Sequence, residues 1–141
     1  INNLWIRTAI DTGFLFKILL HCQNNKVNLA FQGELVGESL FDNFEGIKGH
    51  TIYFFDIYDI DNKTYLSPSQ RIALLGEIGL NSVPIHNFTM TLPESPKELL
   101  ALADGESGLN GKFREGFVYK SHSRDFSFKV VSNQFLERTG E

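Results

Sequence analysis

Two short alternating stretches late in the sequence constrain the fold of this chain most. Residues 115–120 (Glu-Gly-Phe-Val-Tyr-Lys) and 127–131 (Ser-Phe-Lys-Val-Val) each alternate with a period of two, and Ser121 to Asp125 form a short connection between them. A period of two is the spacing of side chains on one face of a β-strand, and a tight polar connection joins antiparallel neighbours. The two stretches therefore predict a β-hairpin.

Ionic side chains stand among the apolar ones on this predicted hairpin. Alternation places Glu115 with Phe117 on one face of the first strand and Lys120 on the other face. On the second strand Lys129 lies opposite the apolar side chain of Phe128. A carboxylate and two ammonium groups are therefore expected close together on one small sheet.

Composition limits the classes of protein that the chain can belong to. Its 141 residues are 42% hydrophobic, which suits one domain with one sizeable core. Seventeen acidic and thirteen basic residues give a net charge of -4, which excludes a polybasic nucleic-acid surface and leaves only a local patch for such a contact. A single cysteine, Cys22, excludes an internal disulfide and favours a cytoplasmic location, and no apolar run is long enough for a membrane span.

The remaining elements are predicted from caps and from hydrophobic periodicity. A capping residue before an amphipathic stretch predicts a helix, and alternating or clustered β-branched and aromatic residues predict a strand. We expect helices over 2–20, with Asn3 as a possible cap and Gly13 as a possible interruption, over 67–78, capped by Ser67, and over 95–104, capped by Ser95. We expect strands over 27–37, 51–60 and 83–92. These elements predict an α+β fold of mainly antiparallel sheets with flanking helices. The four histidines show no metal-ligand spacing, and we assign none of them a catalytic role.

Four of these stretches, in order, resemble motifs of the covalent nucleotidyltransferases, the superfamily of ATP-dependent RNA and DNA ligases and mRNA capping enzymes. Residues 115–120 resemble motif IV (Glu-Gly-x-Val-x-Lys), and Phe128-Lys129 resembles the start of motif V. Upstream, residues 31–38 resemble motif III and residues 51–60 resemble motif IIIa. The tail Ser132-Asn133-Gln134-Phe135-Leu136 is similar to that of RNA ligases of the Deinococcus type.

The resemblance implies a nucleotide-binding cleft between the sheets. It assigns Glu34 to the ribose of the nucleotide, and it assigns Phe55 and Asp56 to the motif in which an aromatic ring stacks on the purine. A purely structural role is the alternative for each residue: Glu34 as an exposed strand glutamate and Phe55 as an ordinary core residue. Adjacent strand residues point to opposite faces, so Phe55 and Asp56 line one pocket only if a bulge or the strand end turns one of them.

The resemblance also implies roles on the hairpin. Lys129 would bind the α-phosphate of ATP, and Glu115 would help to hold Mg²⁺ or Mn²⁺, through water because Mg²⁺ gives up its waters reluctantly. Lys120 either contributes to catalysis or neutralises a neighbouring acid such as Asp56. Many members of the superfamily have a second motif V lysine where this chain has Val131.

The implied activity is that of an ATP-dependent RNA ligase. Such an enzyme joins the 3′-OH and 5′-phosphate of RNA ends or of a nicked duplex through lysyl-AMP and RNA-adenylate intermediates. Motif I (Lys-x-Asp/His-Gly) and motif Ia are absent from the sequence. We therefore expect residues 1–141 to be the C-terminal portion of an adenylation domain that does not adenylate itself, because the nucleophile is missing. A DNA ligase or capping-type enzyme and a non-catalytic nucleotide-binding remnant are the alternatives.

Overall fold

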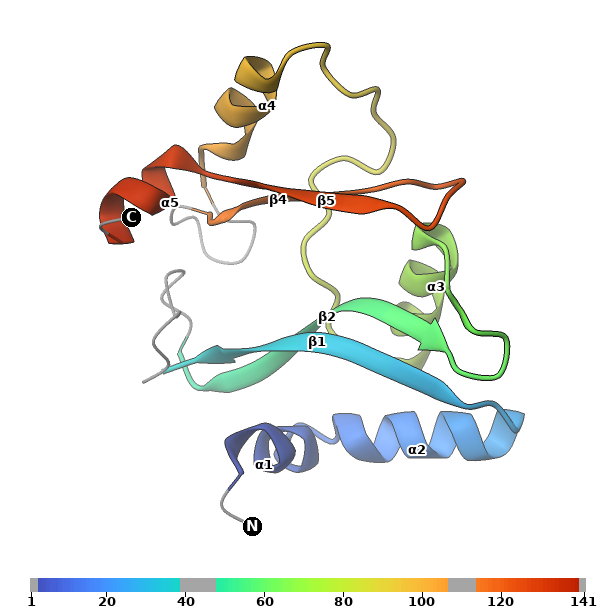
Figure 1. The fold of residues 1–141 in the computed structure, drawn as a ribbon. Coiled ribbons are helices and arrows are strands. Elements are labelled where there is room, and N and C mark those ends of the chain that lie inside the picture. Colours follow the sequence, from blue (N-terminus) through green and yellow to red (C-terminus); the bar gives the residue numbers. More distant parts are fainter. Residues whose placement is uncertain (1–2, 39–47, 107–113, 140–141) are drawn as a thin grey trace.

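The computed structural model describes residues 3–38, 48–106 and 114–139. Figure 1 shows helices below a first sheet and a second sheet above it. The helices are α1 (Leu4–Asp11) and α2 (Phe14–Asn25), and the first sheet has the order β1 (Leu29–Gly37), β2 (His50–Asp59), β3 (Thr64–Tyr65). The second sheet pairs β4 (Gly116–Lys120) with β5 (Ser127–Val131), and every strand pair is antiparallel. The predicted α+β fold and the predicted hairpin are confirmed.

The first predicted helix is present as two helices. Asn3 caps α1, because its side-chain oxygen accepts a hydrogen bond of 3.0 Å from the backbone N–H of Ile6. Gly13 has a φ of 78°, a left-handed conformation that glycine adopts without a steric penalty, and the chain changes direction there before α2. The predicted interruption at Gly13 is therefore confirmed.

A β-bulge in β2 decides which side chains enter the core. Gln32 of β1 pairs with Asp56 and Gly33 pairs with Phe54, so Phe55 has no partner in the ladder. Such an extra residue shifts the alternation of its strand by one position. As a result Phe54 and Ile57, three residues apart, both face the helices and are 1% and 0% exposed.

The main core lies between the first sheet and the helices. Phe54 is at its centre and makes edge-to-face ring contacts with Phe14 of α2, at 5.8 Å between centroids, and with Phe31 of β1, at 6.2 Å. The helix α3 (Pro68–Ile78) contributes Leu75, which is 1% exposed. The first sheet thus has one covered face, and its other face is turned toward β4 and β5.

Both predicted capping sites begin helices. Ser67 and Gln70 form the reciprocal capping box of α3, with Pro68 at the first helical position. Ser95 accepts a hydrogen bond from the N–H of Glu98 at the start of α4 (Pro96–Ala103). The helix α5 (Asn133–Thr139) begins one residue after β5.

The predicted strand over residues 83–92 is wrong. The structure has no strand there, only an isolated bridge between Ser82 and Phe54 and a hydrogen bond from the N–H of Val83 to the carbonyl of Phe54. Pro84 removes the next backbone donor, which ends pairing with β2. Beyond it the segment leaves the first sheet, and Ile85 and Phe88 are 43% and 46% exposed.

Within the three described ranges, the structure contains no helix that combines the length and the apolar character needed to cross a bilayer.

Candidate functional site

The bulge in β2 turns Phe55 and Asp56 toward one neighbour. Asp56 pairs with Gln32 on the face of the first sheet that lies opposite α1 and α2. The ammonium of Lys120, from β4, lies 2.7 Å from Oδ2 of Asp56 and 5.8 Å from the centroid of the Phe55 ring. Phe55 is half-buried, and Phe54 fills the core position. The bulge therefore meets the condition under which both residues can line one site.

Two cations share the Asp56 carboxylate. Lys120 contacts one of its oxygens, and Nη1 of Arg71, from α3, lies 3.7 Å from the other, Oδ1. The side chain of Arg71 is only 4% exposed, and its Nε is buried without a hydrogen-bond partner. Burial lowers the pKa of the Arg71 guanidinium, and the Asp56 charge acts in the opposite direction. Two positive charges on one negative charge leave this cluster with an excess of one positive charge.

Lys129 of β5 forms an ion pair with Glu115, the residue just before β4. Strict alternation predicts these side chains on opposite faces, since Lys129 pairs with Val118. Glu115 lies outside the regular strand, so alternation does not hold there, and its carboxylate reaches the face of Lys129. The following Gly116 fits because a Cβ atom at that position would overlap the carbonyl oxygen of Val130.

The predicted site residues are thus distributed over two sheet surfaces that face each other. Glu34 of β1 is exposed and pairs with Tyr53, which puts it on the same face as Gln32 and Asp56. On the hairpin, register puts Lys129 on the same face as Lys120. The contact between Lys120 and Asp56 joins the two surfaces.

The opposite face of the hairpin is aromatic. The rings of Tyr119 and Phe128 stack at 5.1 Å between centroids, and Phe117 lies 6.3 Å from Tyr119. Burial raises the pKa of the Tyr119 phenol, and the charge of Arg114 acts in the opposite direction. The ionic face, which carries Lys120 and Lys129, is turned toward the first sheet, as the contact between Lys120 and Asp56 shows.

Sequence reasoning missed Arg71. A signal was present, because Arg71 and Leu75 are four residues apart and therefore lie on the same stripe of the predicted helix. Both are buried in α3, at 3% and 1% exposure. An arginine on an apolar stripe indicates a buried partner, and here this partner is Asp56.

The described residues contain no group of three or more His, Cys, Asp or Glu side chains able to hold a metal ion. The candidate site instead offers the carboxylate of Glu115, which is 39% exposed. Mg²⁺ is commonly held by one or two carboxylates together with substrate phosphates and water. The donor set at Glu115 therefore fits a metal that arrives with a phosphate ligand.

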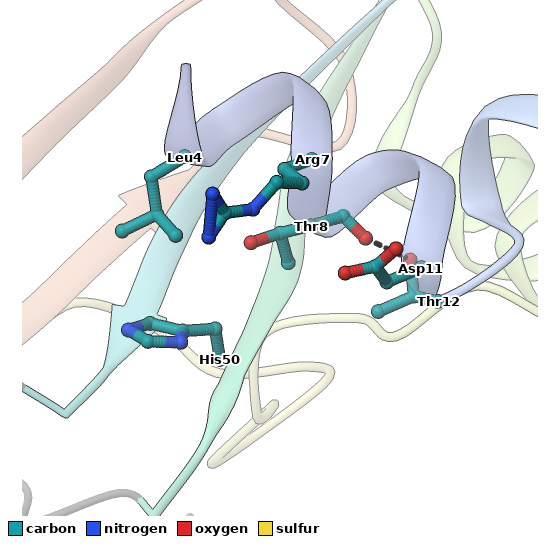
Figure 2. A pocket seen from close by; sticks show the side chains of 6 residues that line it. All are labelled: Leu4, Arg7, Thr8, Asp11, Thr12 and His50. Atoms are coloured by element: carbon teal, nitrogen blue, oxygen red, sulfur yellow. Dashed lines mark hydrogen bonds between the residues drawn. The ribbon is translucent and has the colours of Figure 1, made fainter. Parts of the chain in front are cut away.

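A separate hollow of about 190 Å³ lies beside α1 and the start of β2. Figure 2 shows its lining, which includes Arg7, Asp11 and His50. The ring Nε2 of His50 lies 2.8 Å from the backbone carbonyl oxygen of Glu38. None of the predicted site residues lines this hollow.

Comparison with known sequence families identifies the class of protein. The sequence model of the family described as RNA ligase matches residues 2–131. This match covers most of the 141 residues, and the chain therefore belongs to the RNA ligase family.

Solved structures of one RNA ligase, from Naegleria gruberi, are similar to this chain. A mutant of that ligase with ATP and Mn is 37% identical, with a TM-score of 0.84 over 95% of this chain and 40% of that chain. A second mutant with ATP and Mn is 36% identical, with a TM-score of 0.85 over 96% of this chain and 40% of that chain. The same ligase with PPi is 37% identical, with a TM-score of 0.84 and coverage of 95% and 40%.

The chain accordingly spans about two fifths of the length of these solved relatives. No curated protein matches the sequence.

Proposed function

We propose that this chain is the C-terminal portion of the adenylation domain of an ATP-dependent RNA ligase, which joins RNA 3′-OH and 5′-phosphate ends. One observation carries the proposal. Phe55 and Asp56 at the bulge of β2 lie on one sheet surface, and the Glu115–Lys129 ion pair lies on the surface that faces it. The contact between Lys120 and Asp56 connects the two surfaces. Family membership and the ATP and Mn in the Naegleria structures support the choice of ligand.

The proposed reaction is a series of three nucleotidyl transfers. The nitrogen of a lysine outside these 141 residues attacks the α-phosphorus of ATP and releases pyrophosphate. The AMP then passes to an RNA 5′-phosphate, and an RNA 3′-OH finally displaces AMP as the phosphodiester forms. Phosphoryl chemistry of this kind requires mainly positioning and neutralisation of charge from the protein.

The proposed roles follow from the chemistry of each side chain. Glu34 accepts hydrogen bonds from the ribose hydroxyls, and the Phe55 ring stacks on the purine. The ammonium of Lys129 neutralises the α-phosphate, after it exchanges its Glu115 partner for a phosphate oxygen. Lys120 keeps its contact with Asp56 and supplies positive charge beside Phe55.

Glu115 is the proposed holder of Mg²⁺ or Mn²⁺. When bound, the ion supplies neutralisation of charge on the phosphate oxygens. Since Val131 stands where many relatives in the superfamily have a second lysine, Lys129 provides the only motif V ammonium. We expect the excess positive charge of the cluster formed by Arg71, Asp56 and Lys120 to compensate in part.

Strand joining by the intact protein tests this function. The substrate is a nicked RNA duplex with a labelled 5′-phosphate, and the changes are Lys129→Ala and Glu115→Ala. We expect both variants to stay folded and to lose sealing, whereas the exposed controls Lys97→Ala and Glu77→Ala retain it. Normal sealing by either site variant would count against the assignment.

A second outcome separates the alternatives. If the intact wild-type protein binds ATP but seals neither RNA nor DNA, the chain is part of a nucleotide-binding remnant. Sealing of DNA in preference to RNA would assign it to DNA joining. We further propose a role in RNA repair. We also propose a cytoplasmic location, which the single half-buried cysteine, Cys22, supports.

A further inference from the structure

The Glu115–Lys129 pair lacks the burial that would fix its geometry. The side chain of Lys129 is 46% exposed and that of Glu115 is 39% exposed. Ion pairs open to water are weak, because solvent screens the attraction and both side chains lose rotamer freedom when they meet. The precise placement of Glu115 must therefore come from its backbone, and the structure fixes this backbone on both sides.

On the N-terminal side, Arg114 ties the start of β4 to the end of α4. Its Nε donates to the carbonyl oxygen of Ala103 at 3.0 Å, and Nη2 donates to that of Leu102 at 2.6 Å. These carbonyls belong to the last turn of α4, where acceptors lack helical partners and where positive charge is favoured. The guanidinium carbon also lies 4.1 Å from the centroid of the Phe117 ring.

On the other side, Ser132 ties Glu115 to the end of β5. The backbone N–H of Ser132 donates to the carbonyl oxygen of Glu115 at 2.7 Å. Its hydroxyl donates to Oδ1 of Asp104 at 2.6 Å and accepts from the N–H of Phe135, at the start of α5, at 3.3 Å. Ser132 is 0% exposed, so this connection is shielded from water.

We propose that Arg114, Asp104 and Ser132 form a clamp of positioning residues, which fixes the backbone of Glu115 so that its carboxylate pairs with Lys129 when the site is empty and is in place for a metal-bound phosphate when the nucleotide binds. The proposal rests on the proposed function and deepens it. The clamp also explains a serine at position 132 of the tail. Ser132 bonds to the backbone of Glu115 at the open end of the hairpin, caps α5 and donates to the carboxylate of Asp104. The clamp touches no reacting atom and acts only through Glu115 and its partner.

Binding of Mn²⁺ to the intact protein at saturating AMP, which has no pyrophosphate to release and therefore cannot adenylate the lysine, tests the clamp. The electron paramagnetic resonance signal of free Mn²⁺ gives the affinity directly, without any turnover. We expect Ser132→Ala and Arg114→Lys to weaken Mn²⁺ binding about 10- to 100-fold, the range for loss of groups that orient a metal ligand. Thermal melting checks that each variant is folded, and the milder of the two remains informative if the other fails to fold.

Ser95→Ala is the matched control. Like Ser132→Ala it removes a serine that caps a helix, but Ser95 lies at the far end of α4, where its hydroxyl accepts a hydrogen bond from Glu98 of the same helix. We expect Ser95→Ala to keep the Mn²⁺ affinity of the wild type. Unchanged Mn²⁺ affinity in a folded Ser132→Ala variant, or an equal loss in Ser95→Ala, would overturn the clamp.

A second readout separates this proposal from the proposed function. The NMR signal of the Lys129 side-chain nitrogen reports its pairing with Glu115 in the absence of any ligand. The clamp predicts that Ser132→Ala moves this signal toward its position in Glu115→Ala. If the wild-type protein binds neither ATP nor Mn²⁺ but Ser132→Ala still moves the Lys129 signal, the proposed function is refuted and the clamp is retained. If Ser132→Ala leaves the Lys129 signal unmoved, the clamp itself is refuted.

Discussion

Replacement of Gly33 by alanine perturbs the bulge and the candidate site at one point. Gly33 pairs with Phe54, directly beside the unpaired Phe55, and it precedes Glu34. A Cβ atom at Gly33 would lie 2.9 Å from Cγ2 of Ile52 and 2.9 Å from the backbone oxygen of Tyr53. Ile52 is 0% exposed, so it has no free space to enter, and the backbone oxygen moves only if β1 and β2 separate.

The expected cost is that of an overpacked core. Inserting one methyl group into a well-packed interior destabilises a protein by about 1–3 kcal/mol. For a chain of this size each kcal/mol lowers the melting temperature by roughly 2–4 °C, so Gly33→Ala lowers it by roughly 2–12 °C. The proposed roles of Glu34 and Phe55 also predict weaker ATP binding, because both residues shift with the two strands.

Gly76→Ala is the opposite control. Gly76 lies in α3 and has no atom within 4 Å of the position of an added Cβ. Alanine in a helix is favoured over glycine by roughly 0.5–1 kcal/mol, so this change raises the melting temperature. Thermal and urea denaturation followed by circular dichroism measures both variants. A melting temperature in Gly33→Ala equal to or above that of the wild type would refute the account of the β1–β2 packing.

Three further results are expected. Asp56→Ala destabilises the protein by about 3–5 kcal/mol in urea denaturation because it leaves the buried Arg71 charge uncompensated, and an effect no larger than that of Lys120→Ala would contradict this. The hydrogen bond from Ser132 is the main cause that lowers the pKa of Asp104 below its ordinary 3.8. The stabilisation of the folded protein by the Asp104 carboxylate is therefore present above that value and is lost as pH falls through the lower folded-state pKa. The urea midpoints of the wild type and of Asp104→Asn should converge at the acid end, and a constant difference between them would count against this cause. Phe55→Ala weakens ATP binding in calorimetry by about 1–3 kcal/mol, the usual effect of removing a stacking ring from a base, whereas an unchanged affinity would return Phe55 to a packing role.

Local signals in the sequence predicted the elements that depend on local physics. The caps at Asn3 and Ser67 are present because a short polar side chain reaches the free N–H groups of its own helix. The hairpin is present because its alternation and its tight connection lie within one short stretch. Of the two alternatives for Lys120, neutralisation of Asp56 agrees with the ion pair of 2.7 Å in the structure.

Long-range features could not be predicted in the same way. The position of the bulge depends on the register between β1 and β2, which no single strand specifies. The composition of residues 83–92 predicts a strand, yet a strand also needs a partner edge, and Pro84 ends the pairing with β2 just after the bridge between Ser82 and Phe54. The acceptors of Arg114 are backbone carbonyls, which leave no trace in the side-chain pattern.

The most direct test of the central claim is a crystal structure of the intact protein with ATP and Mn²⁺. The account predicts the ribose at Glu34, the purine against Phe55 and the α-phosphate at Lys129, with the metal on the side of Glu115. A nucleotide bound elsewhere, for example in the hollow lined by Arg7 and His50, with the Glu115–Lys129 pair left intact, would contradict it.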